Sequence, residues 1–229
     1  MPAGYPNGKV ASQVINELMK EFPPESFKDY KIITAFATEP AYIMSTKRIS
    51  NLNEMKGAQL RISGNLTPVI QALGGAPVGM SMGEVPEAVQ TGVVEGNISS
   101  REVLMDLQLA EFLKYTTDYP LSVTTFAAVM NKDVWDSLPD NVKQVIDELR
   151  DEAAAYAGEY LDKHVQEALE WSKKEHGLEV VTLTDEEKAK WDELIAPLQE
   201  QYVQQMNDQG LPGDEFKKRL DELIQQFSQ

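Results

Sequence analysis

The sequence predicts an α/β fold in which short parallel strands alternate with helices. Between about residues 52 and 112, brief apolar runs are separated by helically spaced segments that end at glycines, which is the pattern of βαβ units. A second observation is an apolar stripe at helical spacing from Val142 to Trp171, with Gly158 the only breaker before Gly177. About 35 helical residues would extend roughly 50 Å, which exceeds a small domain. We therefore expect this helix to bridge two lobes or to enter an oligomer.

The remaining elements follow from periodicity and from their stop signals. An amphipathic helix is expected at residues 10–22, where Pro23 and Pro24 end it. Strands are expected at residues 31–36, 41–44, 59–63, 76–80, 95–98, 122–130 and 178–183. Further helices are expected at residues 52–55, 68–73, 84–91, 101–112, 132–137, 184–206 and 214–227, besides the long helix that Pro139 opens. Asn131 is expected to cap the helix at 132–137, and residues 184–187 resemble a capping box.

Composition limits the classes of function. The 229 residues include 42% hydrophobic and 25% charged residues, enough for one large domain or two small lobes with a core. The net charge of −16 argues against binding to nucleic acid or to anionic membranes. Without cysteine, the chain can form neither disulfides nor zinc–cysteine sites. No apolar run is long enough to predict a transmembrane helix, and the N-terminus lacks the pattern of a signal peptide. If the protein is exported, we expect its signal peptide to lie outside this chain.

One arginine is the strongest candidate for ligand recognition. Arg61 lies inside the apolar strand pattern Leu60-Arg61-Ile62, and Gly64 follows closely. An arginine buried in a strand is costly unless it meets an anion, and a carboxylate matches the guanidinium fork best. The alternatives are a structural ion pair and an exposed residue at a sheet edge.

Polar residues at the end of the strand at 95–98 form a second candidate group. Asn97, Ser99 and Ser100 could hydrogen-bond a ligand, because polar groups converge where parallel strands end, or they could serve as turn and cap residues. Met80 could contact a ligand or pack in the core. One histidine, His164, with Glu167 nearby does not make a metal site. We predict no catalytic residue, no metal and no cofactor.

Three segments carry a family resemblance. They read KGAQLRISG, LGGAPVGMSMGEVPEAVQTGVVEGN and FLKYTTDYPLSVTTFAAVMNKDVWDSLPDNVKQVIDE. In this order and spacing they resemble the solute-binding proteins of tripartite ATP-independent periplasmic (TRAP) transporters, in the dicarboxylate-type branch. The resemblance runs from about Gly4 to the C-terminus. It implies a type II periplasmic-binding-protein-like architecture of two α/β lobes around a cleft, with long C-terminal helices. It also implies a non-enzymatic, periplasmic protein that captures an organic acid and delivers it to the membrane permease subunits.

The resemblance also assigns residues. Arg61 occupies the position of the arginine that holds the ligand carboxylate in this family. In the family an asparagine often follows a turn by two to three residues. Here the turn is Glu95-Gly96, Asn97 follows it immediately, and Ser99 falls nearer the usual position. Some members carry a second arginine where Ala41 stands, and Tyr42 beside it could offer an aromatic contact instead. The residues expected to line the cleft around Arg61 are Tyr42, Met80, Asn97, Ser99 and Phe126.

The chain departs from the family in length, since members carry a further segment ahead of the first helix. We therefore expect an incomplete first lobe: residues 1–40 would be its remnant with a crossing strand, and 41–119 the second lobe. Residues 120–229 would supply a return strand, the long bridging helix and the C-terminal helices. Apolar faces without partners predict a homodimer through the first-lobe surface or the long helix. The alternative function is a helical dimer or interaction protein that binds no small molecule.

Overall fold

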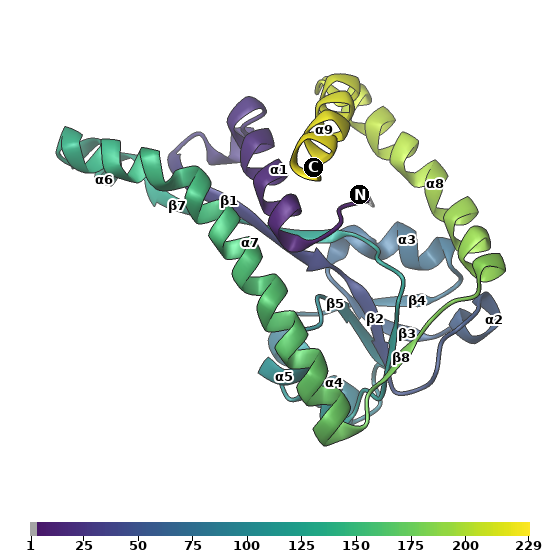
Figure 1. The fold of residues 1–229 in the computed structure, drawn as a ribbon. Helices are drawn as coiled ribbons and strands as arrows, with labels where there is room; N and C mark the ends of the chain where they lie inside the picture. Colours follow the sequence, from purple (N-terminus) through teal and green to yellow (C-terminus); the bar gives the residue numbers. More distant parts are fainter. Residues whose placement is uncertain (1–3) are drawn as a thin grey trace.

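The computed structural model describes residues 4–229, apart from the side chain of Asn65. Its strands form two sheets, a two-stranded ribbon of β1 and β7 and a six-stranded sheet in the order β4-β3-β5-β2-β6-β8 (Figure 1). The α/β prediction is therefore confirmed. The strands are β1 (Tyr30–Pro40), β2 (Tyr42–Ser45), β3 (Gln59–Ile62), β4 (Ala76–Gly79), β5 (Gly96–Ser99), β6 (Tyr115–Thr117), β7 (Val123–Asn131) and β8 (Glu179–Val181).

The helices agree with most of the expected ranges. Asn131 caps the sixth helix as predicted, accepting bonds from the amides of Asp133 and Val134. The α-helices are α1 (Gly8–Glu21), α2 (Leu52–Met55), α3 (Thr67–Ala72), α4 (Val85–Gln90), α5 (Val103–Asp106), α6 (Lys132–Ser137), α7 (Asp140–His176), α8 (Asp185–Asp208) and α9 (Gly213–Phe227). Short 3-10 turns are η1 (Glu25–Phe27), η2 (Gly64–Leu66), η3 (Met82–Glu84) and η4 (Leu109–Glu111). Among the described residues, no helix has the length and apolarity to cross a bilayer.

The six-stranded sheet is mixed. β3 lies between β4 and β5 and is parallel to both, as the βαβ pattern predicts. β2 is antiparallel to its neighbours β5 and β6, while β8 is parallel to β6. One face packs against α3 and α8 around Ile43, Leu60 and Trp191. The opposite face packs against α4, α5 and α7 around Met44 and Leu104.

Helices α1 and α9 pack together against the ribbon of β1 and β7. Val14 of α1, Leu220 of α9 and Ala37 of β1 belong to one buried cluster. The outer edge of β1 is satisfied by side chains of α1: Ser12 Oγ bonds both the amide and the carbonyl of Ala37, and Asn16 Oδ1 accepts the amide of Ala35. β7 pairs with β1 alone among the described strands, so its other edge is open.

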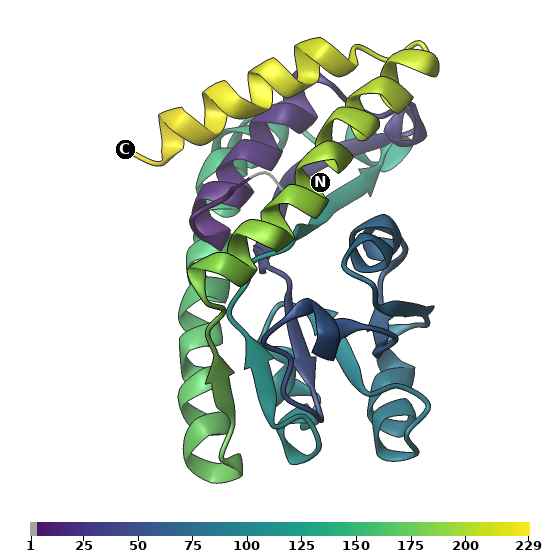
Figure 2. The ribbon, with the colours of Figure 1, turned by 90° about the vertical axis from the view of Figure 1, so that its right-hand side faces the viewer.

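The 37-residue helix α7 connects the two sheets and is about 55 Å long at 1.5 Å per residue. It contacts α1 and β1 through residues that include Asp147, Asp151 and Asp162, and α5 through His164, so the bridging interpretation agrees with the structure. Figure 2 shows α7 along one side of the molecule, from the level of α1 down to the six-stranded sheet. The predicted apolar stripe is only partly buried: Val165 and Leu169 lie in the core, whereas Val145 and Leu149 are exposed.

Three local predictions need correction. The helix expected at residues 101–112 was wrong, because Gln108 takes a left-handed conformation (φ 54°) that separates α5 from η4. The three-residue strand β6 was missed, since so short a segment shows no periodicity. The capping box at Thr184 is only half formed: Thr184 accepts the amide of Glu187, but the Glu187 carboxylate accepts the amide of Leu52 instead.

Candidate functional site

Arg61 lies where the carboxyl ends of β3, β4 and β5 meet. Its side chain is buried, with the residue only 5% exposed. Nε and Nη2 donate to the carbonyl oxygen of Met80, just after β4, at 3.0 and 2.9 Å. Nη1 lies 3.5 Å from Oδ1 of Asn97 on β5. Two neighbouring strands therefore fix the guanidinium through neutral oxygens.

Strand register places Asn97 in the same row as Arg61. The two residues are paired between β3 and β5, and Asn97 is opposite Met44 on β2. Asn97 is completely buried, and its Nδ2 has no hydrogen-bond partner among the described residues. A buried amide nitrogen without a partner is costly, so it is a donor available to an added acceptor.

Arg61 has no carboxylate within ion-pair distance among the described residues, although the chain contains 37 acidic residues. Three of the five arginines, Arg48, Arg101 and Arg219, do pair with a carboxylate. Burial lowers the pKa of Arg61 below its usual range, because the charged form has lost water without gaining an anion. The structural ion pair considered for Arg61 is thus absent from the described part of the chain, and the residue is not an exposed edge residue.

Tyr42 and Ser99 are opposite each other on β2 and β5, two residues along from the pair of Met44 and Asn97 and on the same face of the sheet. The Tyr42 ring, however, is covered by a second arginine: the Arg101 Cζ lies 3.7 Å from the ring centroid. Arg101 in turn binds the Glu39 carboxylate with Nε and Nη2 at 2.9 and 2.8 Å, and its amide adds a third bond at 2.8 Å. Burial works to lower the pKa of Arg101, but the bonds and charge of Glu39 outweigh it and raise that pKa.

Sequence reasoning missed the pair of Arg101 and Glu39. Both residues are buried, at 8% and 6% exposure, where β1 passes into β2 and where β5 ends. The available signal was the same as for Arg61, a charged residue next to an apolar strand, but Arg101 was assigned to the start of a helix. The nearby Ser100 hydroxyl donates a hydrogen bond to the Glu102 carboxylate. This contact agrees with the turn and cap role that was one of the two roles considered for Ser100.

No described contact joins the Arg61 guanidinium to Phe126 or to the side chain of Met80. Phe126 lies on β7 of the other sheet, 46% exposed, and stacks on Phe36 with ring centroids 5.4 Å apart. Met80 contributes its carbonyl to Arg61, while its side chain packs against the core beneath α4. A cavity of about 300 Å³ lies between the two sheets, lined by Ser63 after β3 and by Thr124 and Thr125 of β7, among others.

His164 is part of an ion pair rather than a metal site. Its Nε2 lies 2.8 Å from Oδ1 of Asp106 on α5, and its Nδ1 lies 3.7 Å from Glu167. The hydrogen bond with Asp106 raises the pKa of His164 most, against a smaller effect of burial. The described residues contain no group of three or more histidine, cysteine or acidic side chains placed to hold a metal.

The family of the chain follows from comparison with known proteins. Residues 1–205 match the model of bacterial extracellular solute-binding proteins, family 7. The chain belongs to this family. The resemblance to TRAP solute-binding proteins is therefore confirmed.

Individual family members show how far the similarity extends. The C4-dicarboxylate-binding periplasmic protein of Rhodobacter capsulatus is 28% identical over 156 residues, which is 67% of this chain and 47% of that protein. A TRAP periplasmic solute-binding protein from Desulfovibrio salexigens is 36% identical with a TM-score of 0.86, covering 98% of this chain and 70% of that one. A marine metagenome TRAP protein specific for aromatic acid ligands, solved with 3-hydroxybenzoate, is 26% identical with a TM-score of 0.92, covering 100% and 73%.

The chain spans only part of the curated relatives that it matches, 47% of the Rhodobacter protein and 59% of a Sulfitobacter solute-binding protein. The family model describes bacterial extracellular solute-binding proteins.

Proposed function

We propose that this chain is the solute-binding part of a TRAP transporter component and that it captures a small organic acid through its carboxylate. The single observation that carries the proposal is Arg61, a buried guanidinium held by neutral oxygens and lacking an anion among the described residues. A ligand carboxylate would supply the missing charge and restore the pKa that burial lowers.

The neighbours of Arg61 fit the same chemistry. Because Met80 holds Nε and Nη2 from one side, the Nη groups keep further N–H donors for a carboxylate. The unpartnered Nδ2 of Asn97 adds a neutral donor in the same row. We assign Ser99 and Tyr42 to the wall beside them and Phe126 to the opposite wall on β7. The two lobes would be residues 41–119 on one side, and 1–40 with 120–229 on the other.

The proposal places the protein in the periplasm, delivering its ligand to the permease subunits without catalysing a reaction. Its support is the family, whose named relatives include periplasmic proteins for C4-dicarboxylates and, in Ruegeria pomeroyi, for ectoine and 5-hydroxyectoine. The neighbour specific for aromatic acids adds a second ligand class.

Calorimetry of this chain against succinate, malate, benzoate and 3-hydroxybenzoate tests the proposal. We expect saturable binding of at least one acid at a site that Arg61→Ala weakens, and no binding of the matching amide, which lacks the charge. If all acids and amides behaved alike, carboxylate recognition would be refuted.

A second candidate, self-association, has its own structural support. The free edge of β7 runs for nine residues without a charged side chain, and Phe126 and Val129 on it are 46% and 41% exposed. Natural edge strands are usually protected by charge, proline or short length, so an uncharged edge invites pairing with a second copy. The exposed Val145, Leu149 and Tyr156 of α7 offer the other surface for a dimer. A protein that only self-associates would form the dimer and bind none of the acids.

A further inference from the structure

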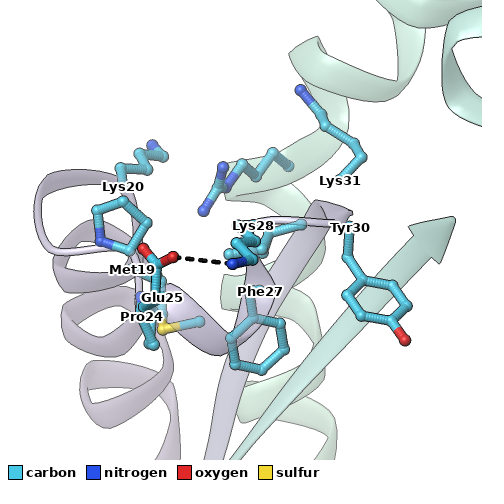
Figure 3. Close-up of a pocket in the computed structure, with 11 residues that line it drawn as sticks. Met19, Lys20, Pro24, Glu25, Phe27, Lys28, Tyr30 and Lys31 are labelled. Carbon is cyan, nitrogen blue, oxygen red and sulfur yellow. Dashed lines mark ion pairs between the residues drawn. The ribbon is translucent and has the colours of Figure 1, made fainter. Parts of the chain in front are cut away.

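A second cavity, away from the ends of β3, β4 and β5, lies where α1 ends and β1 begins. It has a volume of about 420 Å³ and is bounded by the loop around Pro23 and Pro24, the turn η1, the start of β1 and Arg150 of α7 (Figure 3). Small-molecule sites typically measure about 300–1,000 Å³, so the volume suffices for a small ligand.

The cavity has an unusual charge for this protein. Four cationic side chains line it, Lys20, Lys28, Lys31 and Arg150, against the single carboxylate of Glu25, in a chain of net charge −16. Such a lining favours a small anion only where one of the cations lacks a carboxylate partner.

The three lysines already have partners. Lys20 binds Asp151 and Glu17 at 2.5 and 2.6 Å, and Lys31 binds Asp147 at 2.6 Å. Lys28 pairs with Glu25 at 3.2 Å, the contact drawn in Figure 3. These pairs neutralise most of the local charge and leave the arginine.

Arg150 is the group without an anion. Its Nε donates to Oδ1 of Asn16 at 3.0 Å, and no carboxylate of the described residues lies within ion-pair distance. Its Nη2 is shielded from solvent and has no hydrogen-bond acceptor among them. Burial lowers the pKa of Arg150, and the charges of Asp151, Glu17 and Asp147 only partly offset that effect. Like Arg61, Arg150 has no ion-pair partner among the described residues, although it is less buried and lies nearer to carboxylates.

The rest of the lining is apolar. Pro23, Pro24, Phe27 and Ile32 supply aliphatic and aromatic surface around the arginine. A cation at one side of an apolar pocket suits a ligand with one anionic group and an apolar body. A polyanion such as citrate would find only one unpaired cation there.

We propose that this cavity is a second anion site, which binds the carboxylate of a small aromatic or aliphatic acid at Arg150 with the body against Phe27 and the prolines. The site is independent of the one at Arg61, because Arg150 belongs to α7 and contacts the ribbon side of the molecule, whereas Arg61 belongs to the six-stranded sheet.

The arginine Nε–Hε signals in the ¹⁵N NMR spectrum test this directly, since the chain has five arginines and each signal can be assigned by a single substitution. During titration with sodium benzoate, against sodium chloride of equal concentration, we expect the Arg150 signal to shift saturably. The shift should persist in Arg61→Ala. The signals of Arg48 and Arg219, which already bind carboxylates, serve as internal controls and should not saturate.

The apolar wall is tested by ligand size and by one substitution. Benzoate should half-saturate the Arg150 signal at a concentration about fivefold or more below that of acetate, because its ring gains apolar contact. Phe27→Ala should reduce this preference and leave acetate unchanged. The proposal is overturned if the Arg150 signal responds to benzoate as it does to chloride, if its shift disappears in Arg61→Ala, or if acetate and benzoate bind equally.

Discussion

Arg61 is anchored by a carbonyl oxygen, that of Met80, and not by a carboxylate. A carbonyl fixes the plane of the guanidinium but leaves its full charge uncompensated in a buried place. Under the proposed function, the ligand carboxylate would meet a guanidinium whose orientation is already fixed.

The first prediction concerns this residue. Arg61→Ala should weaken carboxylate binding by about 10- to 100-fold or more, since hydrogen bonds to charged groups are each worth about 1.5–3 kcal/mol. Arg61→Lys should bind with intermediate affinity, because it keeps the charge and loses the fork. Calorimetry measures both. Arg48→Ala, at an exposed ion pair with Glu179, is the matched control and should bind like the unaltered chain. Equal affinity of Arg61→Ala and Arg48→Ala would rule out the clamp.

The second prediction concerns the buried pair of Arg101 and Glu39, which joins the end of β5 to the crossing from β1 to β2. Removing one partner of such a pair leaves an uncompensated buried charge and typically costs about 3–5 kcal/mol. Glu39→Gln and Arg101→Met should each lower the free energy of unfolding by that order, as urea denaturation would report.

The double variant is the control for this pair. Glu39→Gln with Arg101→Met removes both charges, so it should be markedly more stable than either single variant. Additive losses would mean that the two side chains contribute separately and that the bidentate contact is not energetically coupled.

How well a feature could be predicted depends on how far apart its residues lie in the sequence. α7 and the cap at Asn131 were predictable because their signals lie within a few residues. The contact of Arg101 with Glu39 was not, since its partners are 62 residues apart and neither residue type is rare next to a strand. Periodicity also gave the apolar stripe of α7, but it does not tell which half meets a neighbour: Val165 is buried and Val145 is exposed.

The placement of Arg61 beside Asn97 followed from the parallel order of β3 and β5, whereas the role of the Met80 carbonyl required the backbone itself. The assigned cleft residues Tyr42, Ser99 and Phe126 stay predictions.

The third prediction concerns the open edge of β7. If copies of this chain pair there, Val129→Lys should shift the protein from dimer to monomer in sedimentation equilibrium, because a lysine on an edge strand opposes pairing and carries its charge into the contact. Tyr156→Lys, at a residue 70% exposed on α7, tests the alternative surface and should leave a β7 dimer intact. The β7 interface is contradicted if only Tyr156→Lys dissociates the dimer, or if the unaltered chain is monomeric.

The fourth prediction is a pH dependence at His164. The bond to Asp106 raises its pKa above that of the unfolded chain, so the protonated form stabilises the fold. This contribution is complete below about pH 6.5, the ordinary histidine pKa, and is lost as the pH rises through the folded-state value. Between about pH 6 and pH 8, the stability advantage of the unaltered chain over His164→Gln should shrink by about 0.2–1 kcal/mol. Asp106→Asn should lose the same pH dependence of stability, as measured by thermal unfolding. If its pH dependence matched that of the unaltered chain, the assignment would be contradicted.

The last prediction concerns Gly158, where α7 crosses α1. A Cβ at this position would lie 2.5 Å from the carbonyl oxygen of Gly8 and 2.6 Å from both Lys9 Cα and Ser12 Oγ. One turn further along α7, Asp162 accepts the amides of Gly8 and Lys9 at 2.7 and 2.9 Å, so the start of α1 is held against the glycine.

Two effects of Gly158→Ala oppose each other. Alanine should gain about 1 kcal/mol in helix propensity, whereas overpacking against backbone costs about 1–3 kcal/mol, and displacement of α1 also weakens the bonds to Asp162. The steric cost wins, because two of the three crowding atoms belong to the backbone and cannot rotate away. We expect a net loss of stability of about 1–2 kcal/mol in urea denaturation. Gly83→Ala is the control: no heavy atom lies within 4 Å of its added Cβ, so this variant should lose no stability. A stabilised Gly158→Ala would mean that α1 and α7 cross less closely in solution than in this structure.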